Sequence, residues 1–118
     1  MKPIFLLPVT LICLLASPAY GFNLLFLRDA PVAEFDSVDT GLMVENFYYA
    51  MNNGENGVTS SWENEDTGHF GAVTPLDSVK DGNKTCRNVR VENSAKSNSG
   101  TSNFKFCKEV GGKWLISE

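Results

Sequence analysis

The chain has 118 residues, of which 42% are hydrophobic, and its 14 acidic and 10 basic residues give a formal net charge of −4. This length predicts one folded domain, because domains run from roughly 50 to 200 residues. A weakly acidic domain is poorly suited to nucleic acid or to anionic lipid surfaces, so these two classes of partner are excluded first.

The first 21 residues have the three parts of a secretory signal peptide. Lys2 supplies the positive charge, residues 4–16 form an uncharged apolar stretch, and small residues precede a cleavage point. We expect cleavage after Gly21, with cleavage after Ala19 as the alternative. An uncleaved membrane anchor is the competing interpretation, but the apolar stretch is shorter than the roughly 20 residues that a transmembrane helix needs.

Three cysteines become two when the signal peptide is removed, because Cys13 lies inside it. Ile12 is too large for the position before a lipidated cysteine. In an exported domain the remaining pair, Cys86 and Cys107, predicts a disulfide. Its loop of about twenty residues gives roughly 3 kcal/mol of stabilisation in the chain-entropy model. Two free buried thiols are the alternative.

Beyond the cleavage point the chain divides into an arm and a domain. Residues 22–35 are predicted to form an N-terminal arm, whose apolar run is either a short strand or a segment that packs on the domain. Residues 36–118 are predicted to form the domain, and no membrane span is expected after signal cleavage. Loss of Lys2 leaves 9 basic against 14 acidic residues, so the net charge becomes −5.

A helix is predicted over residues 37–53. Asp36 or Ser37 can cap its amino end, and Asp39 places negative charge near the positive end of the helix dipole. Apolar side chains recur at helical spacing and form a broad face that would pack on a sheet. The helix should end at Gly54, where glycine readily adopts the left-handed conformation.

After Gly57 the pattern changes to period 2, which predicts strands. Turn-forming residues from 64 to 68 predict a hairpin, and this hairpin would place Trp62 opposite Phe70 as an aromatic pair. Pro75 cannot donate to a ladder, so it predicts a strand end or an edge.

A second hairpin follows a turn at residues 81–83, and its two cysteines fix the register. The predicted pairs are Cys86 with Cys107, Arg87 with Phe106, Val89 with Phe104 and Val91 with Ser102. A one-residue slip would scatter the valines and phenylalanines over both faces. The polar residues 93–101 are predicted to be a mobile loop, and residues 114–116 a final short strand.

Together these elements predict an α+β fold in which one N-terminal helix packs on a four-stranded antiparallel meander sheet. Trp62 and Trp114 are expected in its core rather than in a ligand groove, because large aromatic side chains dominate small cores.

The candidate chemistry is sparse. His69 is the only histidine, and a nucleophilic pair or a zinc site would need partners that two bridged cysteines cannot supply. We expect His69 on the surface of a turn beside Glu63. The acids around Asn64 lack the spacing of a calcium loop. We therefore predict no catalytic residue, metal or cofactor, and a partner-binding turn made of Glu63, Asn64, Glu65, Asp66 and His69.

The longest distinctive phrase runs from Trp62 to Pro75 and reads WENEDTGHFGAVTP. It is followed by Cys86-Arg87, by Phe106-Cys107-Lys108, and by a terminal Gly-Lys-Trp-Leu-Ile. This arrangement resembles the surface-antigen domain of the bacterial 17 kDa outer-membrane antigens, the rickettsial and Legionella-type surface proteins. That domain typically reads Trp-x-Asn-Pro-x-Thr-Gly-x-x-Gly-x-Val-Thr-Pro, then two Cys-Arg pairs and Asp-Gly-x-Trp.

The resemblance covers about residues 35–118 and has departures. Glu65 stands where the family often has proline, Lys108 replaces the second arginine, and Gly111 replaces an acidic residue. The lipidated amino terminus and the glycine-zipper segment of many relatives are absent, so surface anchoring is not implied. The family has no established catalytic residues, so the resemblance implies a fold and a compartment but no reaction.

The sequence therefore predicts an exported, non-enzymatic, surface-antigen-like domain that acts as a binding or structural module. Its expected partners are envelope proteins or cell-wall-associated components, and its expected location is the periplasm, the cell surface or the medium. A secreted effector or inhibitor is the alternative, and a small hydrolase is a more remote one.

Overall fold

The computed structural model describes residues 30–117, so the predicted signal peptide and most of the predicted arm lie outside the described residues. Its elements are α1 (Ala30–Ala33), α2 (Ser37–Asn53), β1 (Ser60–Asn64), β2 (His69–Asp81), β3 (Lys84–Ser94), β4 (Ser99–Glu109) and β5 (Leu115–Ile116).

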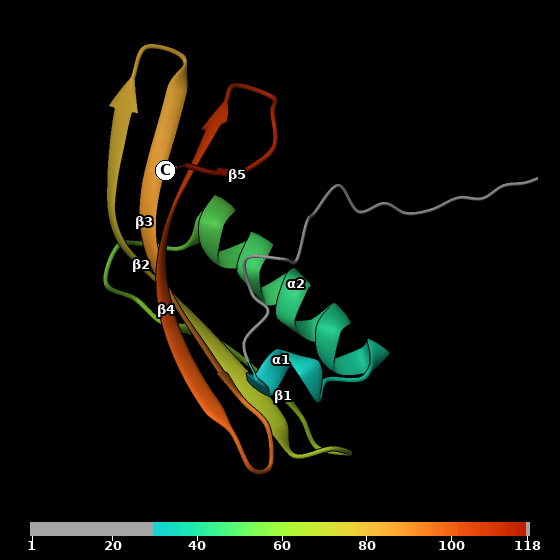
Figure 1. Cartoon of the computed structure of the whole chain (residues 1–118). Helices are drawn as coiled ribbons and strands as arrows, with labels where there is room; N and C mark the ends of the chain where they lie inside the picture. The colour runs from blue at the N-terminus through green and yellow to red at the C-terminus, as the bar shows by residue number, and fades with distance from the viewer. Residues whose placement is uncertain (1–29, 118) are drawn as a thin grey trace, which may run out of the picture.

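The strands form one antiparallel meander in the order β1-β2-β3-β4-β5, and α2 lies across one face of it (Figure 1). The α+β class and the helix-on-sheet arrangement are confirmed. The predicted final short strand is present as Leu115–Ile116, which pairs with β4, so the sheet has five strands and not the predicted four. α1 lies against β3 and β4, and α2 packs on β1 and β2.

Helix α2 has the predicted bounds. The carboxylate of Asp36 accepts a hydrogen bond from the Asp39 amide at 2.8 Å, and the Asp39 carboxylate accepts one from the Asp36 amide at 2.9 Å. This reciprocal pair is a capping box. The carboxyl end differs from the expectation, since Gly54 is extended, with φ −76°, rather than left-handed. The side chain of Arg87, in β3, binds carbonyl groups at the end of the helix instead.

The core lies between α2 and the sheet. Its buried members are Met43, Phe47, Ala50, Met51, Trp62, Val73, Val89, Val91, Phe106 and Trp114. The Phe47 and Phe106 rings meet edge to face with centroids 5.0 Å apart. Both tryptophans are 7% exposed, which confirms their predicted place in the core.

The first hairpin has a register one residue away from the predicted one. Asn64 pairs with His69, which leaves a four-residue turn, so Trp62 pairs with Gly71 and Glu63 with Phe70. The predicted Trp62–Phe70 pair is therefore wrong. Because neighbouring residues of a strand face opposite sides, Trp62 points to the core and Phe70 to the other face, where it is 51% exposed.

Gly71 is a position where no larger side chain fits. A Cβ atom there would lie 2.5 Å from Trp62 Nε1, 2.7 Å from Asn93 Oδ1 and 2.7 Å from the Glu92 carbonyl oxygen. We expect Gly71→Ala to lower the free energy of unfolding, measured in urea, by about 1–2 kcal/mol, because overpacking forces its neighbours apart. The matched control is Gly41→Ala in α2, where nothing lies within 4 Å. That change should stabilise the protein by about 0.5–1 kcal/mol, and a stable Gly71→Ala variant would contradict the close packing.

Strand β2 continues through Pro75 to Asp81, so the predicted strand end is wrong. The β1–β2 ladder stops at Val73, two residues before Pro75, and the buried Pro75 accepts a hydrogen bond at its carbonyl from the Gly57 amide instead. The β2–β3 register shifts between Pro75 and Asp77, which is a β-bulge. Proline is tolerated at edges and bulges since it has no amide to donate to a ladder.

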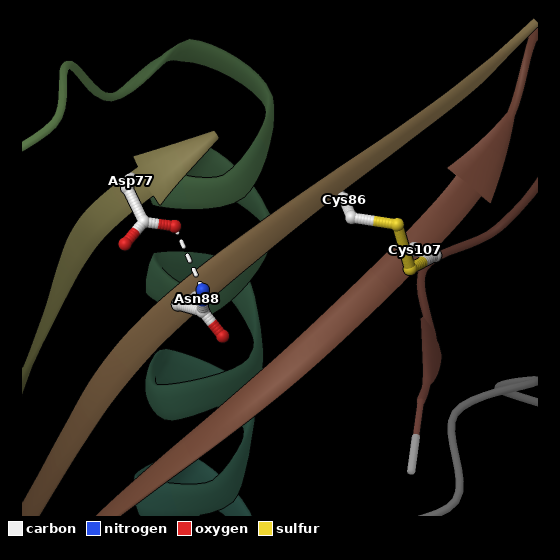
Figure 2. The surroundings of a disulfide bond; sticks show 4 residues. All are labelled: Asp77, Cys86, Asn88 and Cys107. Atoms are coloured by element: carbon white, nitrogen blue, oxygen red, sulfur yellow. Dashed lines mark hydrogen bonds between the residues drawn. A yellow bond between two sulfur atoms is a disulfide. The ribbon is translucent and has the colours of Figure 1, made fainter. Parts of the chain in front are cut away.

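The second hairpin has the predicted register, with all four predicted pairs present. The Cys86–Cys107 disulfide joins β3 to β4 (Figure 2). The predicted loop over residues 93–101 is wrong, because β3 runs to Ser94 and β4 starts at Ser99. Backbone pairing continues through this polar stretch, and the turn that remains is closed by bonds between the backbones of Ala95 and Asn98.

Candidate functional site

The residues predicted to form a partner-binding turn fall into two groups. The exposed ones are Glu63, Glu65 and Asp66. The buried ones are Asn64 and His69, each 7% exposed. The prediction of a surface histidine is therefore wrong. The His69 ring stacks against Phe35, with centroids 5.4 Å apart, and turns inward to bond the first turn of α2.

Asp39, in the first turn of α2, is the centre of these buried contacts. Its side chain is fully buried and accepts four hydrogen bonds. The donors are the Asp36 amide at 2.9 Å, Asn64 Nδ2 at 2.8 Å, Thr67 Oγ1 at 2.8 Å and His69 Nδ1 at 2.8 Å. Because an ionised carboxylate only accepts, His69 carries a proton on Nδ1. We call Asp39, Asn64, Thr67 and His69 the Asp39 cluster.

The same side chains also shape the turn between β1 and β2. The Thr67 hydroxyl accepts a bond from the His69 amide at 3.2 Å, and Asn64 Oδ1 accepts one from the Asp66 amide at 3.0 Å. Gly68 has φ +79°, a conformation that side chains disfavour. The Asn, Thr, Gly and His of the distinctive phrase therefore form the turn and attach it to the helix.

The pKa of Asp39 is set by two opposing effects. Burial raises it, but the bonds from the Asp36 amide, His69, Thr67 and Asn64 outweigh burial and hold the pKa well below its ordinary value of 3.8. The donors therefore stabilise the ionised form of a carboxylate that has no contact with solvent.

This shift predicts a loss of stability in acid. Because the folded-state pKa lies below the unfolded value, the stabilisation is fully present above a pH of 3.8 and is lost as the pH falls through the folded pKa. We expect the free energy of unfolding, measured in urea between pH 7 and pH 3, to fall more steeply for the wild type than for Asp39→Asn. Parallel curves for the two proteins would contradict the assignment.

Arg87 occupies the other end of α2. It is 8% exposed and donates five hydrogen bonds. The acceptors are the carbonyl oxygens of Ala50 at 3.1 Å, Met51 at 2.8 Å and Gly54 at 2.8 Å, with Asn56 Oδ1 at 2.9 Å and Ser78 Oγ at 2.8 Å. A cation at this position also complements the negative end of the helix dipole. Burial lowers the pKa of Arg87, but guanidinium groups stay protonated in proteins.

A second contact holds the same end of α2. Trp114 Nε1 donates to Asn52 Oδ1 at 2.9 Å, and Lys108 Nζ lies 3.5 Å from the same oxygen and 5.3 Å from the centroid of the Trp114 ring. The helix is therefore fastened at its amino end by the Asp39 cluster and at its carboxyl end by Arg87 and Trp114.

Sequence reasoning missed the role of Arg87 and the inward direction of His69. A signal for Arg87 was present, because the predicted register already placed it opposite Phe106 on the face that carries the core. No comparable local signal existed for His69. Its position depends on Asp39, thirty residues earlier in the chain.

The chemistry open to these groups is limited by what they touch. In a catalytic Asp-His pair, the histidine Nε2 exchanges a proton with the hydroxyl or thiol of a nucleophile. The nearby Thr67 hydroxyl is not placed for this role, because it bonds Asp39 and the His69 amide. Among residues 30–117 no three His, Cys, Asp or Glu side chains gather in a way that could hold a metal ion. Within the same range, no helix has the length and apolar character to cross a membrane.

Comparisons with protein-family models, with curated proteins and with solved structures gave no match to this chain.

Proposed function

We propose that this chain is an exported, non-enzymatic domain of surface-antigen type that serves as a binding or structural module of a bacterial envelope. It acts in the periplasm, at the cell surface or in the medium. Its partners are other envelope proteins or cell-wall-associated components.

The observation that supports a module best is the use made of the distinctive polar residues. Asn64, Thr67 and His69 all bond Asp39, and Arg87 bonds the carbonyl groups at the end of α2. Groups committed to such bonds hold the fold in one arrangement and are not available for turnover. The chemistry-bearing residues thus serve to build a rigid frame.

The frame presents the exposed turn acids Glu63, Glu65 and Asp66. The turn is fixed from beneath by the Asp39 cluster, so the carboxylates lie on a rigid support. A rigid binding element loses little conformational entropy when a partner docks. Three carboxylates on such a support suit a partner that presents positively charged groups.

The test is capture of a partner from an envelope extract with the purified protein as bait. We expect Glu63→Gln, Glu65→Gln and Asp66→Asn together to reduce capture. The matched control is Glu45→Gln, Glu55→Gln and Glu92→Gln, which makes the same charge change at exposed sites elsewhere. Equal loss in both triple variants would reject the turn as the binding element. Recovery of the protein only in the cytoplasm would reject the envelope assignment.

A secreted effector or inhibitor is the second candidate, and one observation favours it. The pairing of β1 with β2 stops at Val73, and Gly57 and Asn56 bond Pro75 and Ser78, so the outer edge of β2 has no strand beside it over residues 79–81. An edge of this kind can accept an extended segment of a target. Recovery in the medium, together with capture that survives the triple change at the turn, would support this candidate.

A further inference from the structure

The Cys86–Cys107 disulfide lies on the face of the sheet opposite α2. Arg87 points to the helix, and neighbouring residues of a strand face opposite sides, so Cys86 faces away, as does its partner across the ladder. Both cysteines are partly exposed. A thiol in solution therefore has access to the bond.

The residues next to the disulfide are those that hold the carboxyl end of α2. Arg87 follows Cys86 directly and bonds the carbonyl oxygens of Ala50 and Met51. On the other strand, Cys107 pairs with Leu115, which follows Trp114, the donor to Asn52. One covalent bond thus joins the two strand segments that fasten the end of the helix.

The β3–β4 ladder runs on past the cysteines to the pair Lys84–Glu109, but the elements on either side of it have few contacts. β5 pairs with β4 through two residues, Phe106 with Ile116 and Cys107 with Leu115. On the other side, residues 77–84 at the far end of the β2–β3 hairpin are exposed. Regions with few buried apolar contacts open locally before the rest of a domain. The amino end of α2 is different, because the Asp39 cluster joins it to β1, β2 and their turn and includes neither cysteine.

We propose that the Cys86–Cys107 bond is a thiol-controlled latch on the carboxyl end of α2. A dithiol reductant breaks the S–S bond, two S–H bonds form with two electrons and two protons from the dithiol, and the dithiol becomes a disulfide. β5 and Trp114 then separate from Asn52, and the last turn of α2 loosens. The helix stays attached at the Asp39 cluster.

The test is hydrogen exchange, followed by mass spectrometry, of the oxidised protein and of the same protein reduced with dithiothreitol. On reduction we expect amides in residues 50–57 and 105–117 to exchange faster by about tenfold or more, and those in 60–72 to change by less than about twofold. Mass spectrometry without reductant first confirms the linked Cys86 and Cys107 peptides in the starting material.

The double variant Cys86→Ser with Cys107→Ser should show the reduced pattern with or without dithiothreitol. Reduced wild-type protein keeps the test valid if this variant fails to fold. Faster exchange of similar size throughout the sheet and α2 would overturn the proposal, since the bond would then stabilise the domain as a whole. Unchanged exchange in residues 50–57 would overturn it as well.

Discussion

Replacing Asp39 with alanine should lower the free energy of unfolding by about 3–5 kcal/mol, the range found when one partner of a buried charged network is removed. The carboxylate accepts bonds from Asn64, Thr67 and His69 as well as from the capping amide of Asp36. Its removal leaves the buried Asn64 and His69 side chains without this acceptor, and each such group costs about 1–3 kcal/mol. Urea denaturation at neutral pH measures the effect.

The control for Asp39→Ala is Glu65→Ala in the turn that docks on the helix. Glu65 is an exposed acid at the surface of the turn, so its replacement should change the free energy of unfolding by less than about 0.5 kcal/mol. Since many small domains are stable by only about 5–15 kcal/mol, Asp39→Ala should also lower the melting temperature markedly. If Asp39→Ala lowers the free energy of unfolding no more than Glu65→Ala does, the donors of the cluster have found other acceptors.

Replacing Arg87 with lysine should lower the free energy of unfolding by about 2–3 kcal/mol, although the charge is kept. The planar guanidinium reaches five acceptors in α2, in the segment after it and in β2, whereas an ammonium is a point donor that cannot span them. The loss leaves the Met51 carbonyl of the last helical turn without its donor. Thermal and urea denaturation measure the loss.

The matched control is Arg90→Lys, on the opposite face of the same strand. Arg90 is partly exposed, so the same chemical change should alter stability by less than about 0.5 kcal/mol. Similar losses at the two positions would mean that arginine supports β3 in a general way. A loss confined to Arg87 would support its role as the cap of α2.

The elements that could be predicted from the sequence are those with local signals. The capping residues before Ser37 and the Gly54 stop gave the bounds of α2. The cysteine pair and the alternating valines and phenylalanines gave the β3–β4 register. In both cases the evidence lies within one element or one hairpin, and two independent patterns agree.

The parts that could not be predicted depend on contacts between distant segments. The first hairpin has a four-residue turn closed by Asn64 and His69, and nothing local distinguishes this closure from one that pairs Trp62 with Phe70. The observed closure is favoured by Asp39, which accepts hydrogen bonds from Asn64 and Thr67. The ends of β3 and β4 were missed because their side chains are polar, whereas their pairing rests on backbone groups, with one bond between the Ser94 and Ser99 hydroxyls.

The meander order also has a consequence for the timing of folding. The Asp39 cluster is complete once the chain has reached His69, before either Cys86 or Cys107 has entered a strand. A chain that folds as it emerges, amino end first, can therefore assemble α2, β1 and the start of β2 before the disulfide forms. The disulfide would then form when α2, β1 and the start of β2 are already folded, which limits non-native pairing of the later strands. Pulse-labelled exchange during refolding should show protection of residues 60–72 before residues 100–109, and the opposite order would contradict this sequence of events.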